Sequence, residues 1–261
     1  MKTIFSVLAV IVLCSSCEKV INVDLDESEN KYVIEGEVSN MPAAANTVKI
    51  SQTKKFEDEN AFAGISGAIV NIQVNNGITY ALPETSKGIY TTTAFTGTPG
   101  SVYKLTVSIN GGTVYTATSP MPAQIVSLDT ITVEDFSFGE TVKTIQPDYK
   151  DPLGLGNSYR FIEYANGVQV KHVFVQNDEV SDGLRITTPL INPDGDLKTG
   201  DVVKVSMLCI DERVYKYWYS LDQAATGNSS VTPANPVSNI SGGALGYFSA
   251  HSVTSKTIVV Q

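Results

Sequence analysis

Hydrophobic and polar residues alternate over short runs in the first half of the chain, which is the pattern of half-buried β-strands. Turn residues such as Asn75-Asn76-Gly77 and Asn110-Gly111-Gly112 separate these runs. The alternating runs cover residues 32–38, 47–52, 68–74, 78–82, 88–93, 103–109 and 113–118. Short strands with turns at this regular spacing predict a β-sandwich over residues 31–120.

A second β-rich domain is expected over residues 121–261, because Pro120 and Pro122 discourage a continuing strand ladder at the boundary. Its strands are expected at residues 126–138, 158–164, 168–175, 183–188, 201–210 and 257–260. Residues 211–225 differ, since Val214, Tyr217, Trp218 and Leu221 recur at helical spacing after Asp211, a suitable N-cap. This pattern predicts one amphipathic helix.

Composition narrows the range of functions. The 261 residues include 18 Lys+Arg and 27 Asp+Glu, a formal net charge of −9, without a basic run. Such a chain lacks the electrostatic footprint of a nucleic-acid-binding protein. Three cysteines and two histidines exclude a disulfide framework and a His-rich metal site, and no motif suggests a cofactor. Cys209 lies in an apolar run and is expected to be buried.

The first residues have the features of an export signal. Lys2 precedes an apolar stretch at residues 4–13, too short to span a bilayer. The following Cys14-Ser15-Ser16-Cys17 resembles the lipobox of bacterial lipoproteins, which implies removal of residues 1–16 and attachment of membrane lipid to Cys17. An ordinary secretion signal with an incidental cysteine is the alternative.

Residues 17–30 are rich in acids and are expected to form a tether. Acidic residues close to a lipidated cysteine resemble the surface-export signal of Bacteroidetes lipoproteins. The resemblance implies an outer-membrane, lipid-anchored protein, exposed at the cell surface rather than facing the periplasm.

The order of strands and turns over residues 67–118 resembles transthyretin-like and carboxypeptidase-regulatory-like domains, which are small immunoglobulin-like sandwiches. The expected fold class is therefore mainly β. An immunoglobulin- or transthyretin-like β-sandwich precedes a second β-rich domain with one amphipathic helix.

The second half carries a more specific resemblance. Its segments are Asp151-Pro152-Leu153-Gly154, Gly200-Asp201-Val202, Tyr215-Lys216-Tyr217-Trp218, Asn235-Pro236 and Gly242-Gly243-Ala244-Leu245-Gly246-Tyr247-Phe248. Together they resemble a family of Bacteroidetes lipoproteins catalogued as domain of unknown function 4249. The resemblance implies an outer-membrane lipoprotein that accompanies a TonB-dependent β-barrel, and it defines no catalytic residues.

Three functions remain open from the sequence. The first is a non-catalytic accessory or substrate-capturing subunit of a TonB-dependent transporter. The second is a free-standing cell-surface module for glycan or peptide binding or for adhesion. The third is a hydrolase, which no Gly-x-Ser-x-Gly motif supports.

The segment 235–249 is the main candidate for a binding loop, because its glycines permit backbone conformations closed to other residues. The candidate residues are Asn235, Asn239, Gly242, Gly243, Leu245, Tyr247 and Phe248. Trp218 and Tyr219 of the helix could join this loop. The alternative is a structural loop packed over the apolar stripe of the helix.

Other candidates are weaker. Asp194 and Asp196 offer oxygen ligands for Ca²⁺, but they lack the complete loop pattern and fit a hairpin turn, as does the acidic segment 177–183. Asp129-Thr130-Ile131 resembles the O-glycosylation acceptor of Bacteroidetes extracytoplasmic proteins, with Thr130 as the modified residue. His172 and His251 have no partner at metal-ligand spacing.

Overall fold

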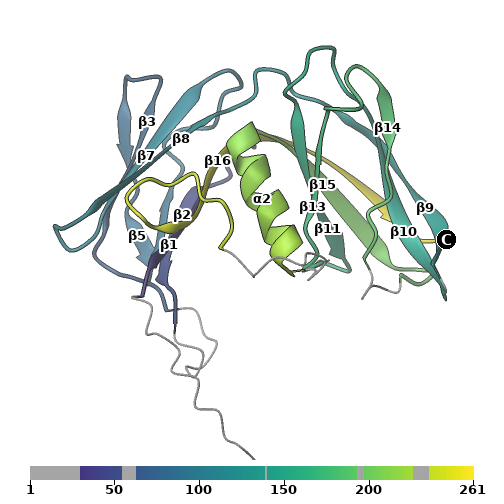
Figure 1. Cartoon of the computed structure of the whole chain (residues 1–261), viewed down its shortest axis with the longest axis horizontal. Helices are drawn as coiled ribbons and strands as arrows, with labels where there is room; N and C mark the ends of the chain where they lie inside the picture. The colour runs from purple at the N-terminus through teal and green to yellow at the C-terminus, as the bar shows by residue number, and fades with distance from the viewer. Residues whose placement is uncertain (1–29, 55–62, 139, 193–194, 196, 226–234) are drawn as a thin grey trace, which may run out of the picture.

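The computed structural model describes residues 30–54, 63–138, 140–192, 195, 197–225 and 235–261. These residues form a mainly β protein with three sheets and one helix, α2 (Figure 1). Within the described ranges no helix has the length and apolar character needed to cross a bilayer. Cys17, with the predicted signal and tether, and the candidates Asp194 and Asp196 lie outside the described residues.

The strands are β1 (Tyr32–Ser39), β2 (Asn46–Gln52), β3 (Ile69–Val74), β4 (Thr79–Ala81), β5 (Glu84–Ser86), β6 (Ile89–Thr92), β7 (Val102–Ser108), β8 (Val114–Pro120), β9 (Leu128–Phe138), β10 (Glu140–Lys150), β11 (Ser158–Ala165), β12 (Val168–Gln169), β13 (Phe174–Asn177), β14 (Arg185–Thr187), β15 (Val202–Ile210) and β16 (Leu245–Val259). Helix α2 covers Glu212–Ala225.

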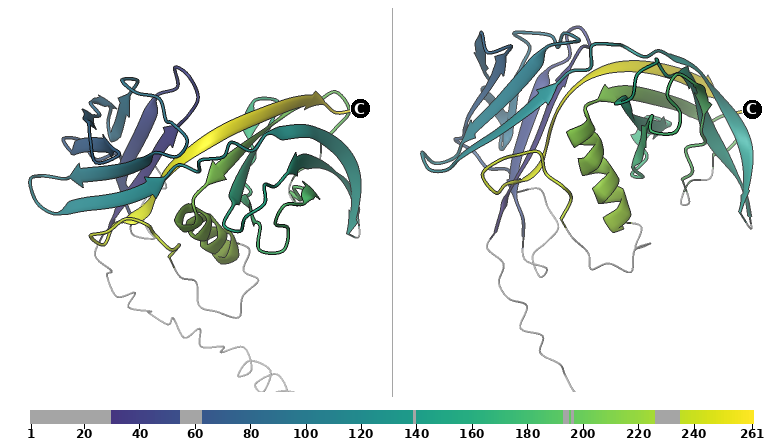
Figure 2. Two further views of the ribbon diagram at one scale, coloured as in Figure 1. Left: turned by 90° about the horizontal axis from the view of Figure 1, so that it is seen from above. Right: turned by 45° about the horizontal axis from the view of Figure 1, so that its top comes forward.

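One sheet runs through the whole molecule in the order β12-β11-β15-β16-β1-β2-β6-β5, with β13 paired to β11. The long strand β16 joins its two halves, since it pairs in parallel with β1 and antiparallel with β15. Figure 2 shows β16 arching from one half to the other. The sheet β4-β3-β7-β8 covers the first half and forms the first unit with it, and the sheet β14-β10-β9 covers the second half and forms the second unit.

Each unit has its own hydrophobic core. Alternate residues of β1, β2, β3 and β7 meet between the sheets of the first unit, as the period of two requires. The first core also contains Phe248 and Ala250 of β16. Because β16 contributes to both units, the proposed division into residues 31–120 and 121–261 stays a prediction.

Strand β15 is buried on one face at its start and on both faces further along. Its first residues alternate between buried and exposed positions, whereas every residue from Val205 to Ile210 is buried. Val205 and Met207 face the second core, while Leu208 and Ile210 pack against Val214 of α2 on the opposite face. The helix therefore lies on the outer face of the sheet, beneath the arch of β16 (Figure 1).

Helix α2 begins where the sequence predicts. The Asp211 carboxylate accepts hydrogen bonds from the backbone N–H of Arg213 (2.9 Å) and of Val214 (3.3 Å), which is N-cap geometry. The Asp211 side chain also accepts a short hydrogen bond from the Ser119 hydroxyl at the end of β8. The cap thus ties the helix to the first unit.

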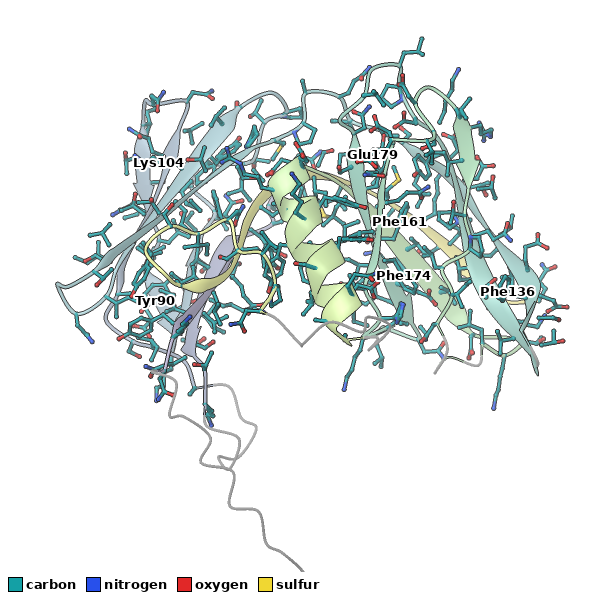
Figure 3. The ribbon with its side chains drawn as sticks, in the orientation of Figure 1. Tyr90, Lys104, Phe136, Phe161, Phe174 and Glu179 are labelled. Carbon is teal, nitrogen blue, oxygen red and sulfur yellow. The ribbon has the colours of Figure 1, made fainter. Side chains whose placement is uncertain are left out.

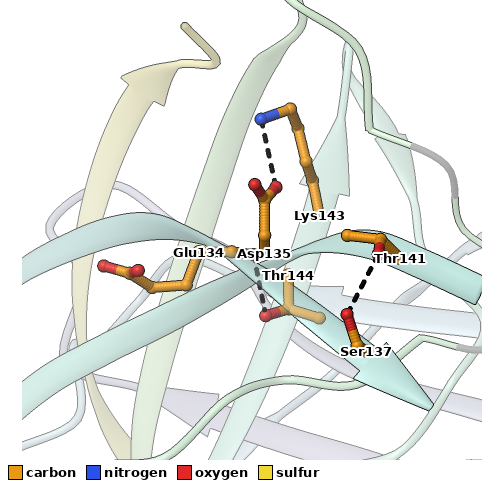
Figure 4. Close-up of polar contacts among 6 residues, drawn as sticks. All are labelled: Glu134, Asp135, Ser137, Thr141, Lys143 and Thr144. Atoms are coloured by element: carbon orange, nitrogen blue, oxygen red, sulfur yellow. Dashed lines mark hydrogen bonds and ion pairs between the residues drawn. The ribbon is translucent and has the colours of Figure 1, made fainter.

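Strands β9 and β10 form a long hairpin with a polar outer surface (Figure 4). Lys143 Nζ lies 3.4 Å from Asp135 Oδ1, and the hydroxyls of Ser137 and Thr141 lie 3.0 Å apart. Strand β10 was not expected from the sequence. It contains Pro147, which pairs with Ile131, and proline is uncommon inside a strand.

Two other strand predictions are corrected. The run 168–175 is not one strand, because β12 and β13 pair with β11 in different registers and residues 170–173 connect them. The predicted strand 257–260 is only the end of β16, which already begins at Leu245. Leu245, Tyr247 and Phe248 therefore lie in a strand rather than in a loop.

Candidate functional site

Two loops meet at the upper end of the second unit in Figure 1, and we treat them as the candidate functional site. Residues 151–157 connect β10 to β11, and residues 178–184 connect β13 to β14. The antiparallel pairing of Ser158 with Asn177 brings the loops together. Figure 3 marks Glu179 at this end, above Phe161 and Phe174 of the sheet.

Three aspartates, of which Asp151 and Asp178 are buried, bind the two loops to each other. Asp178 accepts hydrogen bonds from the backbone N–H of Gly156 (3.0 Å) and from the backbone and side-chain nitrogens of Asn157 (2.9 and 3.0 Å). Asp182 accepts one from the Gly154 N–H (2.6 Å), and Asp151 accepts one from the Gly183 N–H (3.0 Å). Hydrogen bonds to charged groups contribute roughly 1.5–3 kcal/mol each, so these bonds hold both loops in one conformation.

Asp151 is also held by a hydrogen bond from the sheet. It is fully buried and accepts a short hydrogen bond from the hydroxyl of Tyr159 on β11. Burial, strengthened by this bond to Asp151, raises the pKa of Tyr159 far above its ordinary value. The phenol therefore stays protonated and remains a donor to the carboxylate.

The rigid loops present aliphatic side chains to solvent. We call Leu153, Leu155, Val180 and Leu184, which are 86%, 71%, 92% and 57% exposed, the apolar ridge. Single exposed aliphatic residues are common on protein surfaces, but four of them on two hydrogen-bonded loops are a concentration of apolar surface that favours an interaction site.

A hollow lies on each side of the apolar ridge. The first, about 570 Å³, is lined by Ile125, Val126, Pro152 and Leu153, with Asp129 and Lys150 among the polar groups. The second, about 290 Å³, lies between the loops and α2 and is lined by Leu155, Asn177, Glu179, Glu212, Tyr215 and Lys216. The surface therefore combines a projecting apolar edge with two recesses of different chemistry.

Among the described residues, the same loops contain a close group of three acidic side chains. Oxygens of Asp151, Asp178 and Asp182 all lie within 4.8 Å of one another, and such oxygens are the ligands that Ca²⁺ prefers. All three carboxylates already accept hydrogen bonds from loop N–H groups. These bonds account for the group as the structural tie between the loops.

Tyr247, one of the predicted loop residues, is buried at the junction of the two units. Its hydroxyl donates to Glu37 of β1 (2.7 Å), and its ring packs against Tyr217 and Trp218 of α2. Burial, followed by the charge of Glu37, raises the pKa of Tyr247. The guanidinium of Arg160 stacks 3.4 Å from the centre of the Trp218 ring and lies 3.9 Å from Glu37.

The other predicted loop residues are also held by the fold. The Asn239 side chain makes two hydrogen bonds with the backbone of Phe248, of 2.8 and 2.9 Å. Gly242 and Gly243 have positive φ, and a Cβ atom at Gly242 would press on the ring of Tyr115. Whether this segment binds a partner stays a prediction, with Asn235 exposed and Leu245 partly buried.

The remaining candidates occupy different places. Thr130 is exposed on β9, an outer strand of its sheet, so its predicted modification is sterically open and untested. Trp218 is buried and Tyr219 is half-exposed. His172 lies between β12 and β13, and His251 is buried on β16. Cys209 is buried as expected, and burial raises the pKa of its thiol.

The apolar ridge could not be predicted from the sequence, because no local pattern marks it. Asp178 and Asp182 were noticed only as turn residues, and Asp151 only as part of a family motif. Their shared role depends on strand pairing between segments distant in the chain. The one available signal was the spacing of Leu153 and Leu155 between glycines, in a loop where leucine is unusual.

Comparison with known families matches residues 18–257 to a domain of unknown function, DUF4249. Among curated proteins, no match to this chain is found. The match covers the described fold, including β16 up to Thr257 and both loops of the candidate site. The chain therefore belongs to the DUF4249 family.

Proposed function

We propose that this protein is an outer-membrane lipoprotein, anchored by lipid on Cys17, that acts without catalysis as an accessory or substrate-capturing subunit of a TonB-dependent transporter. The observation that carries the proposal is the apolar ridge, whose exposed leucines and valine lie on loops held together by hydrogen bonds. A rigid apolar surface loses little conformational entropy on binding, which favours a protein partner.

The position of the ridge supports this arrangement. The chain enters the first unit at the lower end of β1 in Figure 1, whereas the ridge lies at the upper end of the second unit. A lipid anchor that precedes residue 30 would therefore leave the ridge free to contact a neighbouring protein. On the surface of the cell, the external loops of a β-barrel are such a neighbour.

Cross-linking in cells that naturally carry the protein tests this function. The lipoprotein is isolated after mild cross-linking from the wild type, from a Cys17→Ala strain and from a strain with Leu153→Ser and Val180→Ser. We expect a TonB-dependent barrel with the wild type and a loss of the barrel in both variants. Because the ridge side chains are exposed, their replacement leaves the folded core unchanged.

A matched control uses exposed aliphatic residues elsewhere. Ile78→Ser and Val168→Ser replace side chains that are 66% and 71% exposed and lie outside the loops of the ridge. The control should recover the barrel at the wild-type yield. Recovery of the barrel with the ridge variant at that same yield, or no barrel with the wild type, contradicts the proposal.

A further inference from the structure

The second hollow, between the ridge and α2, has a composition that differs from the ridge itself. Leu155 and Tyr215 of α2 line it, together with the exposed Glu179. Its volume of about 290 Å³ is just below the range of pockets that enclose whole ligands and suits a single side chain. The hollow can therefore receive one residue of a partner that rests on the ridge.

The carboxylates that line the second hollow are only partly neutralised by basic side chains. Lys216 Nζ lies 2.6 Å from Glu212 and neutralises it. Among the described residues, neither Glu179 nor Asp178 forms a salt bridge, and the partners of Asp178 are neutral N–H groups. A positive group that enters the hollow would gain from both carboxylates.

The ring of Tyr215 offers a second attraction for a cation. Tyr215 stacks on Tyr219 with ring centres 5.7 Å apart, which fixes the orientation of its face. Burial, with contributions from Tyr219 and Glu179, raises the pKa of Tyr215, so the ring stays neutral. The protein already uses this combination internally, where Arg160 stacks on Trp218 of the same helix beside Glu37.

We infer that the partner segment docking on the apolar ridge carries a basic side chain, preferably arginine, that enters the hollow formed by Glu179, Tyr215 and Leu155. The inference rests on the proposed docking function and specifies the chemistry of the partner. Arginine is favoured over lysine because its planar guanidinium can stack on Tyr215 while it donates to Glu179. The aliphatic residues of the same segment would contact Leu155 and Val180.

Synthetic peptides test the chemistry without knowledge of the natural partner. Fluorescently labelled peptides of alternating leucine and arginine, leucine and lysine, leucine and serine, or leucine and glutamate are titrated against the purified full-length lipoprotein in neutral detergent. We expect binding in the order arginine, lysine, serine, glutamate. Equal binding of the arginine and serine peptides, or no binding of the arginine peptide, overturns the inference.

Charge-matched variants separate a specific contact from general attraction to an acidic protein. Glu179→Lys should weaken the arginine peptide about tenfold, whereas Glu134→Lys on the β9–β10 hairpin makes the same change of net charge and should leave binding unchanged. Tyr215→Leu should reduce the preference for arginine over lysine. An equal effect of both lysine variants shows general attraction only and overturns the inference.

The outcomes also separate this inference from the proposed function. If the ridge variant loses the barrel while the peptides bind without charge preference, docking stands and the basic partner residue is wrong. If the peptides discriminate as expected while no barrel is recovered, the hollow binds basic segments and the transporter is wrong.

Discussion

Glu163 on β11 allows a quantitative test of how the second core depends on pH. Its side chain is only 3% exposed, and its Oε2 atom has no hydrogen-bond partner among the described residues. It lies opposite Val205 in the strand register, and Phe161 on the same strand is part of the second core. A carboxylate in such surroundings is poorly solvated, and burial raises the Glu163 pKa from 4.5 to about 7.

The sign of the effect follows from proton linkage. The folded protein holds a proton on Glu163 that the unfolded chain releases between pH 4.5 and about pH 7. Stability therefore falls as the pH rises through this interval, and the contribution of Glu163 reaches its full cost above pH 7. A difference of this size in pKa corresponds to about 3 kcal/mol of unfolding free energy.

Glu163→Gln removes the titration and keeps the shape of the side chain. The difference in unfolding free energy between the variant and wild type should shift by about 3 kcal/mol in favour of the variant as the pH rises from about 5 to about 8. At the low end it should be slightly less stable, because the amide leaves its own polar atoms unpaired. Urea unfolding, followed by the fluorescence of the single tryptophan, Trp218, measures the difference at each pH.

Glu134→Gln is the matched control, because Glu134 is exposed on β9 and the change in formal charge is the same. It should leave the pH profile of stability as in wild type. Parallel profiles for wild type and Glu163→Gln over this range refute the reasoning, since they mean that the carboxyl is solvated or paired in the folded protein.

Four further substitutions test the backbone and the loops. Gly246→Ala should lower the unfolding free energy by about 3 kcal/mol or more in urea titrations, because the added Cβ would collide with a backbone carbonyl of β1. Gly200→Ala is its control, because Gly200 has a similar positive φ but lies in open space. This control should lower the unfolding free energy by about 1 kcal/mol. Asp211→Ala should cost about 1–2 kcal/mol through loss of the α2 N-cap, measured the same way. Asp178→Ala should accelerate hydrogen exchange of the loop amides it binds, and unchanged exchange would contradict the structural role of this carboxylate.

Elements set by local signals could be predicted from the sequence. The strands of the first unit alternate clearly because one face is buried and the other is solvated. The turn at Asn75-Asn76-Gly77 is correct because both asparagines adopt positive φ in the hairpin between β3 and β4. Helix α2 is correct because its cap and apolar stripe are both encoded within fifteen residues.

Strand β16 could not be predicted for a physical reason. It is central in the long sheet, and residues 246–252 in its first half are all buried. Ser249, His251 and Ser252 nevertheless occupy buried positions, so the segment lacks the apolar run expected of a central strand. Its Gly246 is needed because β1 approaches too closely for any side chain, and a glycine in sequence indicates a loop.

The candidate site also could not be predicted from the sequence. Its exposed leucines contribute little to folding, and its aspartates stabilise loops rather than the core, so neither group follows a hydrophobic pattern. The exposed ridge side chains and the bonds that hold the loops are therefore separate targets for mutagenesis. Because the apolar ridge is exposed while the bonds that hold it lie beneath, its side chains can be exchanged without loss of the loop conformation. A change in partner recovery after such an exchange therefore reports on binding and not on unfolding, whereas a change in Asp178 alters both.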